Sequence, residues 1–147
     1  MKSKIRIIKL KAGDTYSIRK EVLRKNMTLS HEMKGDHESD ALHLGVYERD
    51  KLVCIGSFMK AARIDLEGRQ YQLRGMATID TAQGKGYGKL LLQEAEAILK
   101  SKDIDILWCN ARVVANDFYK KMGYQVMGDV FEAPQIGPHY VMFKKLK

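Results

Sequence analysis

Hydrophobic and polar residues alternate at the start of the chain. In residues 4–10, KIRIIKL, Ile5 and Ile7 lie on one side and the basic residues lie largely on the other, which predicts a strand with one buried face. Residues 12–26 then follow a helical period, with Asp14 as a capping residue. The apolar stripe of this helix consists of Ile18, Val22 and Leu23.

The rest of the chain alternates between strand-like runs and two further helices. The predicted strands are residues 41–48, 52–64, 71–80, 103–112, 124–132 and 139–146, of which the first two form a hairpin. One helix follows a glycine-rich stretch and ends near Lys100; the other covers residues 113–123, with Val114, Phe118 and Met122 on one face and Gly123 as its C-cap. This order predicts an α/β protein (α+β in some schemes), with a mixed sheet, helices on its faces and a right-handed crossover.

Between the first helix and the hairpin lies a polar stretch without a period, MTLSHEMKGDHESD, residues 27–40. We expect a loop, because no apolar face repeats along it, and a loop of this length in a small domain usually has a function. The spacing of its histidines and carboxylates fits no standard metal site. We therefore expect no metal there. Its acidity could attract a cationic amine to the substrate side of the protein.

Size and composition fit a single domain over residues 1–147, with 45% hydrophobic and 30% charged residues. No apolar run approaches the ~20 residues that span a bilayer, and the start is too short and too charged for a signal peptide. We expect a cytoplasmic protein. The formal net charge of +8 favours anionic partners without choosing among them.

The two cysteines, Cys54 and Cys109, lie inside strand-like runs. We expect buried free thiols, because a disulfide is unusual without a secretion signal. A nucleophilic cysteine stays open, but neither residue has an adjacent histidine.

The most informative stretch is TAQGKGYGKLLLQEAEAILK, residues 81–100. Glycines at 84, 86 and 88 precede a strong helix former. Glycine adopts positive φ at little cost, and the first amides of a helix have no intrahelical partner. Together with the helix dipole and Lys85 and Lys89, this predicts an anion site for phosphate. The alternative is an empty tight turn.

Two common phosphate motifs do not fit. The P-loop pattern fails because Gln83 stands five residues before Gly88 and Leu90 follows Lys89. The dinucleotide pattern fails because Gly88 comes one residue early.

The stretch Gln83-Gly84-Lys85-Gly86-Tyr87-Gly88 instead resembles the pyrophosphate loop of the GNAT family of acetyl-CoA-dependent N-acetyltransferases, Gln/Arg-x-x-Gly-x-Gly/Ala. A second segment, ANDFYKKMGY, resembles the Ala-x-x-Phe-Tyr-x-Lys-x-Gly-Phe/Tyr segment of the same family. The chain is similar to a branch of small bacterial GNAT proteins of unassigned substrate. The resemblance implies a mostly antiparallel GNAT-type sheet.

The resemblance also implies a site for acetyl-CoA as cosubstrate. Its backbone contacts would come from Met76, Ala77, Thr78 and Ile79 and from the loop residues Gln83, Gly84, Lys85, Gly86, Tyr87 and Gly88, with Lys89 beside them. Asn110 and Asn116 could bind the pantetheine arm, or serve only as a turn and a cap. Arg112 could bind a phosphate of coenzyme A or lie in solvent. The amide of Met76 or Ala77 would bind the acetyl oxygen, unless this is an ordinary paired strand.

Tyr119 corresponds to the family's catalytic tyrosine, which protonates the departing thiolate. Transfer from a phenol to a thiolate is uphill by ~2 kcal/mol in water, so the site must assist it or Tyr119 mostly donates a hydrogen bond. A purely packing tyrosine is the alternative. The amine must also lose a proton, and the candidate bases are Glu32, His43, Glu132 and His139, or a water chain.

We therefore expect an N-acetyltransferase that acts on a small-molecule or peptide amine by direct attack in a ternary complex. We expect no nucleic acid and no membrane as partner, and a homodimer is left open. Two alternatives remain: a non-catalytic acyl-CoA-binding regulatory module on the same fold, and a basic nucleic-acid binder. The second lacks an aromatic-basic recognition motif.

Overall fold

The computed structural model describes residues 4–147. Residues 1–3, part of the start that we judged unlike a signal peptide, lie outside the described residues. Seven strands form one sheet in the order β1-β2-β3-β4-β5-β7-β6. The strands are β1 (Ile5–Leu10), β2 (Leu42–Glu48), β3 (Lys51–Lys60), β4 (Gln70–Thr78), β5 (Ile106–Arg112), β6 (Gln125–Ala133) and β7 (Gly137–Lys145). Among the strands of the described residues, only β4 and β5 pair in parallel. The predicted mixed, mostly antiparallel sheet is confirmed.

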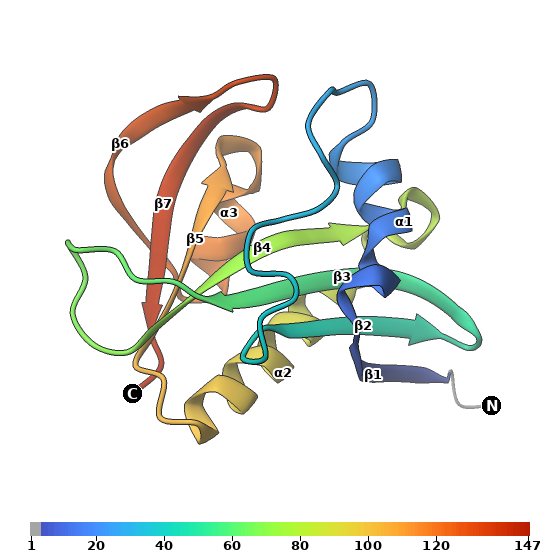
Figure 1. Cartoon of the computed structure of the whole chain (residues 1–147), viewed down its shortest axis with the longest axis horizontal. Coiled ribbons are helices and arrows are strands. Elements are labelled where there is room, and N and C mark those ends of the chain that lie inside the picture. Colours follow the sequence, from blue (N-terminus) through green and yellow to red (C-terminus); the bar gives the residue numbers. More distant parts are fainter. Residues whose placement is uncertain (1–3) are drawn as a thin grey trace.

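Helices cover both faces of the sheet (Figure 1). Helix α2 (Tyr87–Ser101) and helix α3 (Asn116–Lys121) lie behind it in that view, and helix α1 (Tyr16–Ile18) lies in front with the loop that follows. The α2 side chains that pack into the core are Leu91, Leu92, Ala95 and Leu99, each fully buried. Their helical spacing explains why the sequence places this helix correctly.

The predicted first helix is broken into three short pieces. A 3₁₀ turn (Ala12–Thr15) leads into α1, and a wide π turn (Arg19–Leu23) follows. Asp14 is not the N-cap, which is Lys11, but lies three residues later in the first turn, where its carboxylate accepts the amide hydrogen of Lys11 at 2.9 Å. The wide turn begins at Arg19, whose side chain is fully buried.

The predicted face of the last helix is wrong at one position. Val114 is 90% exposed, because the chain forms a 3₁₀ turn (Val113–Ala115) before α3 begins at Asn116. Phe118 and Met122 do pack against the core, and Gly123 ends the helix with a φ of 95°.

Two local features of β4 open the sheet. β4 pairs with β5 only from Gln70 to Leu73, although both strands continue further. On its other side, Arg74 pairs with Ser57 and Ala77 with Ile55, so two residues of β4, Gly75 and Met76, stand opposite one residue of β3. This is a β-bulge, and it bends the strand and removes a residue from regular pairing. β4 and β5 therefore separate just beyond Leu73.

Candidate active site

Two cavities lie where β4 and β5 separate. The loop cavity, of about 740 Å³, lies between the end of β4, the glycine-rich loop and α3. The arginine cavity, of about 390 Å³, lies between β4, β5 and the β6–β7 hairpin. Three residues line both: Met76, Ala115 and Tyr119. The two cavities thus meet at the bulge of β4 and the buried tyrosine of α3.

The loop cavity collects most of the residues predicted to bind a cofactor. Its lining includes Met76, Ala77, Thr78, Gln83, Gly84, Gly86, Tyr87, Gly88 and Lys89. Gly84 and Gly86 have φ values of 80° and 82°, and a Cβ added at either would meet no atom within 4 Å. Glycine therefore permits the backbone conformation here and leaves the space beside it open.

The backbone amides of residues 84–88 are the candidate donors to a bound anion. Among the described residues, they donate no hydrogen bond to a backbone or side-chain acceptor of the protein. The loop itself is braced, because Gln83 donates to the carbonyl of Thr78 at 3.1 Å, and both Lys85 and Tyr87 donate to the carboxylate of Glu48. A braced loop with unused amides at a helix N-terminus has the donors that a diphosphate requires.

Four predicted cofactor residues lie elsewhere. Ile79 is buried and its amide donates to the carbonyl of Val53 at 3.0 Å, so it has no free donor. Lys85 turns away toward Glu48 at 3.3 Å. Asn110 lines the arginine cavity instead. Asn116 lines neither cavity, but its Oδ1 is buried without a donor among residues 4–147.

Tyr119 is 8% exposed and lies at the junction of the two cavities. Burial, with a smaller contribution from the nearby thiol of Cys109, raises the pKa of its phenol well above the usual range. Tyr119 therefore stays protonated at any ordinary pH and acts as a donor, not as a base.

Of the four candidate bases, only His139 lines a cavity. Its Nδ1 lies 2.7 Å from the carbonyl oxygen of Gly137, and its ring stacks on Phe131 with centroids 5.6 Å apart. A carbonyl only accepts, so Nδ1 carries the hydrogen and Nε2 of the neutral ring holds a lone pair. His139 can therefore accept a proton through Nε2.

The other three candidates are poorly placed. Glu32 and Glu132 are exposed and line neither cavity. His43 is buried in a hydrogen-bonded network, with Nδ1 2.7 Å from the hydroxyl of Ser57 and Nε2 2.9 Å from the carbonyl of Asp36. This network occupies both of its nitrogens.

The loop of residues 27–40, the acidic loop, contributes no carboxylate to either cavity. Asp36 is buried and binds Arg19 through both oxygens, at 2.8 and 2.9 Å. The loop supplies Met33 to the arginine cavity. The expectation that its acidity draws a cationic amine into the site has no geometric support. No group of His, Cys, Asp and Glu side chains suited to a metal ion occurs among residues 4–147.

Both cysteines are free and buried, as predicted. Burial raises the pKa of the Cys109 thiol to about 12 and also raises the pKa of Cys54. Neither thiol is a nucleophile near neutral pH.

Sequence reasoning missed several residues that line these cavities. Ala115, Phe118 and Lys121 line the loop cavity and lie within the second motif, so the motif could have pointed to them. Arg24, Arg74 and Phe131 line the arginine cavity. These three residues come from three separate parts of the chain and share no spacing, so only the fold brings them together. Arg112 also lines the arginine cavity, away from the glycine-rich loop.

The sequence profile of the acetyltransferase (GNAT) domain matches residues 12–145. The chain belongs to the GNAT family. It is 37% identical over 136 residues to the uncharacterised N-acetyltransferase YitI of Bacillus subtilis strain 168, covering 91% of both chains. Family and relative together identify the chain as an acyltransferase.

Solved structures support the fold. Escherichia coli ElaA matches with a TM-score of 0.79 at 17% identity, over 96% of this chain and 99% of its own. An aminoglycoside 6'-N-acetyltransferase complexed with coenzyme A matches with a TM-score of 0.78 at 13% identity, over 97% of both chains. Among the described residues of this GNAT protein, none of the helices has the length and apolar character to cross a bilayer.

Proposed function

We propose that this GNAT protein transfers the acetyl group of acetyl-CoA to a primary amine by direct attack in a ternary complex. The observation that carries the proposal is the meeting of the two cavities at Met76, Ala115 and Tyr119. One cavity is lined by unused amides suited to a diphosphate, and the other shares these three residues with it. A donor and an acceptor bound in the two cavities can thus meet at these residues.

The fit to coenzyme A rests on features of this chain. The amides of residues 84–88 would hold the diphosphate, with Lys89 and Lys121 adding positive charge at the same cavity. Bound acetyl-CoA would supply an acetyl group already activated as a thioester.

The bulge of β4 would hold the acetyl oxygen. Because the bulge withdraws a residue from regular pairing, the Met76 amide is the stronger candidate donor, whereas Ala77 is in register with Ile55. An amide preorganised toward an oxygen that gains negative charge contributes about 3 kcal/mol to the barrier reduction.

His139 and Tyr119 would divide the proton chemistry. Nε2 of His139 would take a proton from the ammonium or from the attacking nitrogen as the N–C bond forms. As the C–S bond breaks, the Tyr119 hydroxyl would donate a hydrogen bond to the sulfur. Because its pKa is raised, the phenol keeps its hydrogen at any ordinary pH and can donate this hydrogen bond to the developing thiolate.

Calorimetry with acetyl-CoA, followed by thiol release over a panel of amines, tests the proposal. We expect binding together with amine-dependent thiol release. Binding without turnover on any amine would favour the non-catalytic module, and absence of binding would contradict both. Salt-dependent DNA binding without acetyl-CoA binding would favour the nucleic-acid alternative.

A further inference from the structure

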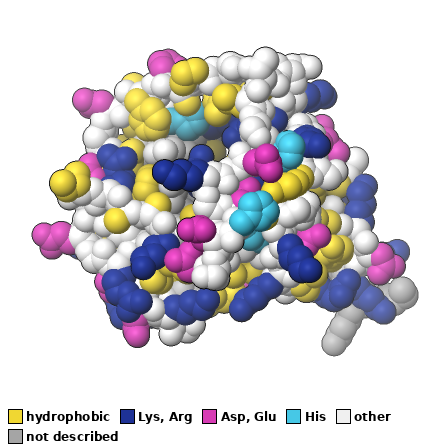
Figure 2. All heavy atoms as spheres, viewed as in Figure 1, with side chains coloured by type: hydrophobic (Ala, Val, Ile, Leu, Met, Phe, Trp, Pro, Cys, Tyr) yellow, Lys and Arg dark blue, Asp and Glu magenta, His cyan; other side chains and the backbone are white. Residues whose placement is uncertain are grey.

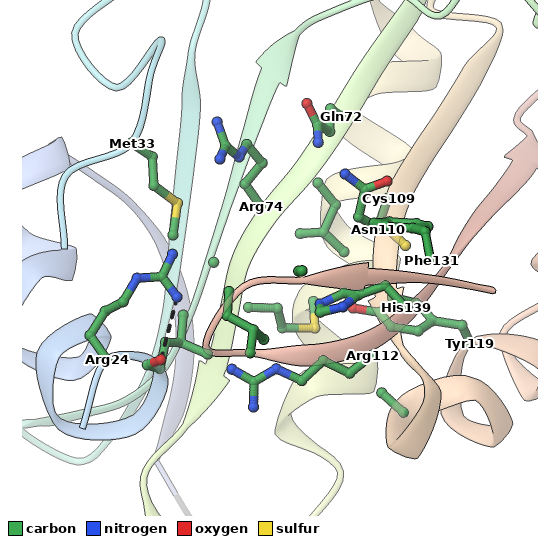
Figure 3. A pocket seen from close by; sticks show the side chains of 18 residues that line it. Arg24, Met33, Gln72, Arg74, Cys109, Asn110, Arg112, Tyr119, Phe131 and His139 are labelled. Atoms are coloured by element: carbon green, nitrogen blue, oxygen red, sulfur yellow. Dashed lines mark hydrogen bonds between the residues drawn. The ribbon is translucent and has the colours of Figure 1, made fainter. Parts of the chain in front are cut away.

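The charged side chains that line the arginine cavity are all positively charged arginines. Three arginines line it, Arg24, Arg74 and Arg112, and no acidic side chain does so among residues 4–147. Figure 3 shows Arg24 and Arg112 extending toward the middle of the cavity from opposite sides. Lys and Arg side chains are also spread over this face of the molecule, most densely along the lower edge of the view (Figure 2).

The protein leaves these charges without a partner. Arg74 and Arg112 make no hydrogen bond or ion pair among the described residues. The carboxylate that acts most strongly on Arg74 belongs to Asp36, and both of its oxygens already bind Arg19. Among residues 4–147, no carboxylate lines the cavity to neutralise these charges.

Arg24 is held in position rather than neutralised. Its Nε donates to the carbonyl of Ser30 at 3.0 Å and one Nη to the carbonyl of Leu23 at 3.3 Å. Burial, and then the charges of Arg112 and Arg74, lower the pKa of Arg24. Unpaired guanidinium groups that are partly removed from water are costly, and a bound anion would relieve this cost.

We infer that the acceptor is an amine that carries an anionic group, a carboxylate or a phosphate, and that Arg24, Arg74 and Arg112 bind this group. The inference rests on the proposed function, because it assigns the acceptor to the arginine cavity. The anion would set the position of the amine relative to His139, whose register partner on β5 is Arg112.

Matched acceptors test the inference. Thiol release from acetyl-CoA is measured with ω- and α-amino acids against their amides, and with O-phosphoethanolamine against ethanolamine. We expect kcat/KM to be at least about 10-fold higher for the anionic member of the preferred pair, as for a charge-assisted hydrogen bond. The carboxylate and phosphate pairs distinguish the two sources of charge. Equal rates within every pair, or preference for the uncharged member or for a polyamine, would overturn the inference.

Substitutions assign the effect to the cavity. Arg112→Gln is expected to lower kcat/KM about 10- to 100-fold for anionic acceptors and less than about threefold for uncharged ones. Arg69→Gln makes the same charge change at an exposed position outside both cavities and should leave both rates unchanged. An equal loss for both acceptor classes in Arg112→Gln would contradict anion recognition.

Anion binding is also measured without turnover, which separates this inference from the proposed function. Inorganic phosphate is titrated by calorimetry into the wild type, Arg112→Gln and Gly86→Val. Weaker binding in Arg112→Gln, with a component retained in Gly86→Val, supports the anion site even if no amine is acetylated. Unchanged binding in Arg112→Gln overturns it even if acetyl transfer is established.

Discussion

The Nδ1 atom of His139 lies 2.7 Å from the carbonyl oxygen of Gly137. This contact places the hydrogen on Nδ1 and leaves Nε2 of the neutral ring as an acceptor beside the arginine cavity.

His139→Gln should lower kcat/KM about 100-fold or more, because a general base contributes about 10²- to 10⁴-fold. Acetyl-CoA affinity should change little, since His139 does not line the loop cavity. Steady-state kinetics and calorimetry check the two parts. Glu32→Gln and Glu132→Gln serve as controls and should keep near-normal turnover. A kcat/KM in His139→Gln within about threefold of the wild-type value would reject His139 as the base.

Tyr119→Phe should reduce kcat at least about 10-fold and leave acetyl-CoA affinity within about twofold, because the lost hydroxyl acts only on the departing sulfur. Since the pKa of Tyr119 is raised, the wild-type profile should show no limb from its ionisation below about pH 10. Tyr124→Phe is the matched control. It is buried, with its ring centroid 5.7 Å from that of Tyr119, but lines neither cavity. Equal kcat in Tyr119→Phe and wild type would leave Tyr119 a packing residue.

Replacement of the buried thiols tests direct attack. Cys109→Ala and Cys54→Ala should keep turnover within about threefold, because burial raises the pKa of both thiols and neither forms a thiolate near neutral pH. Mass spectrometry of the enzyme mixed with acetyl-CoA should detect no acetylated chain. An acetyl adduct on Cys109, lost in Cys109→Ala, would replace direct attack with a covalent route.

The ion pair of Arg19 and Asp36 fixes the loop that supplies Met33 to the site. Asp36→Asn should lower the free energy of unfolding by about 3 kcal/mol at neutral pH, because it leaves a buried guanidinium without its anion. Glu38→Gln, an exposed change in the same loop, should alter it by less than about 0.5 kcal/mol. Denaturant unfolding measures both.

The pH dependence of this contribution has a definite sign. Burial alone would raise the pKa of Asp36, but the hydrogen bonds from Arg19 and the Met33 amide, with the charges of Arg19 and His43, lower it below the usual value. The stabilisation is therefore complete above about pH 4 and is lost as the pH falls through the folded-state pKa. The stability difference between wild type and Asp36→Asn should shrink below about pH 4. A difference that stays constant to lower pH would show that Asp36 carries no such linkage.

The sequence predicted the features that depend on residues close together in the chain, and it missed those that depend on residues far apart. Alternation and helical spacing are local, so β1 and α2 were placed nearly correctly. The glycine-rich loop was identifiable because positive φ, as at residues 84 and 86, favours glycine. The arginine cavity was not identifiable, since Arg24, Arg74 and Arg112 come from three separate parts of the chain and any one arginine resembles a solvated residue.

In the acidic loop, the sequence did not reveal which charges are paired. Its charges suggested a cationic substrate, but the most buried of them, Asp36, forms an ion pair with Arg19. Charge counted along a sequence does not reveal which charges are paired in space. The sequence also did not reveal that both nitrogens of His43 have partners, since Ser57 and Asp36 form no recognisable sequence motif with it.

The central claim is that the backbone of residues 84–88 binds the diphosphate of acetyl-CoA, and calorimetric titration of acetyl-CoA into two glycine variants tests it. Gly86 and Gly128 have similar positive φ values, 82° and 77°, and open space beside them, but only Gly86 lines the loop cavity. Gly86→Val should weaken binding at least about 100-fold, because its side chain occupies the space of the ligand, whereas Gly128→Val should retain the wild-type Kd. Equal affinity in both variants would contradict the account.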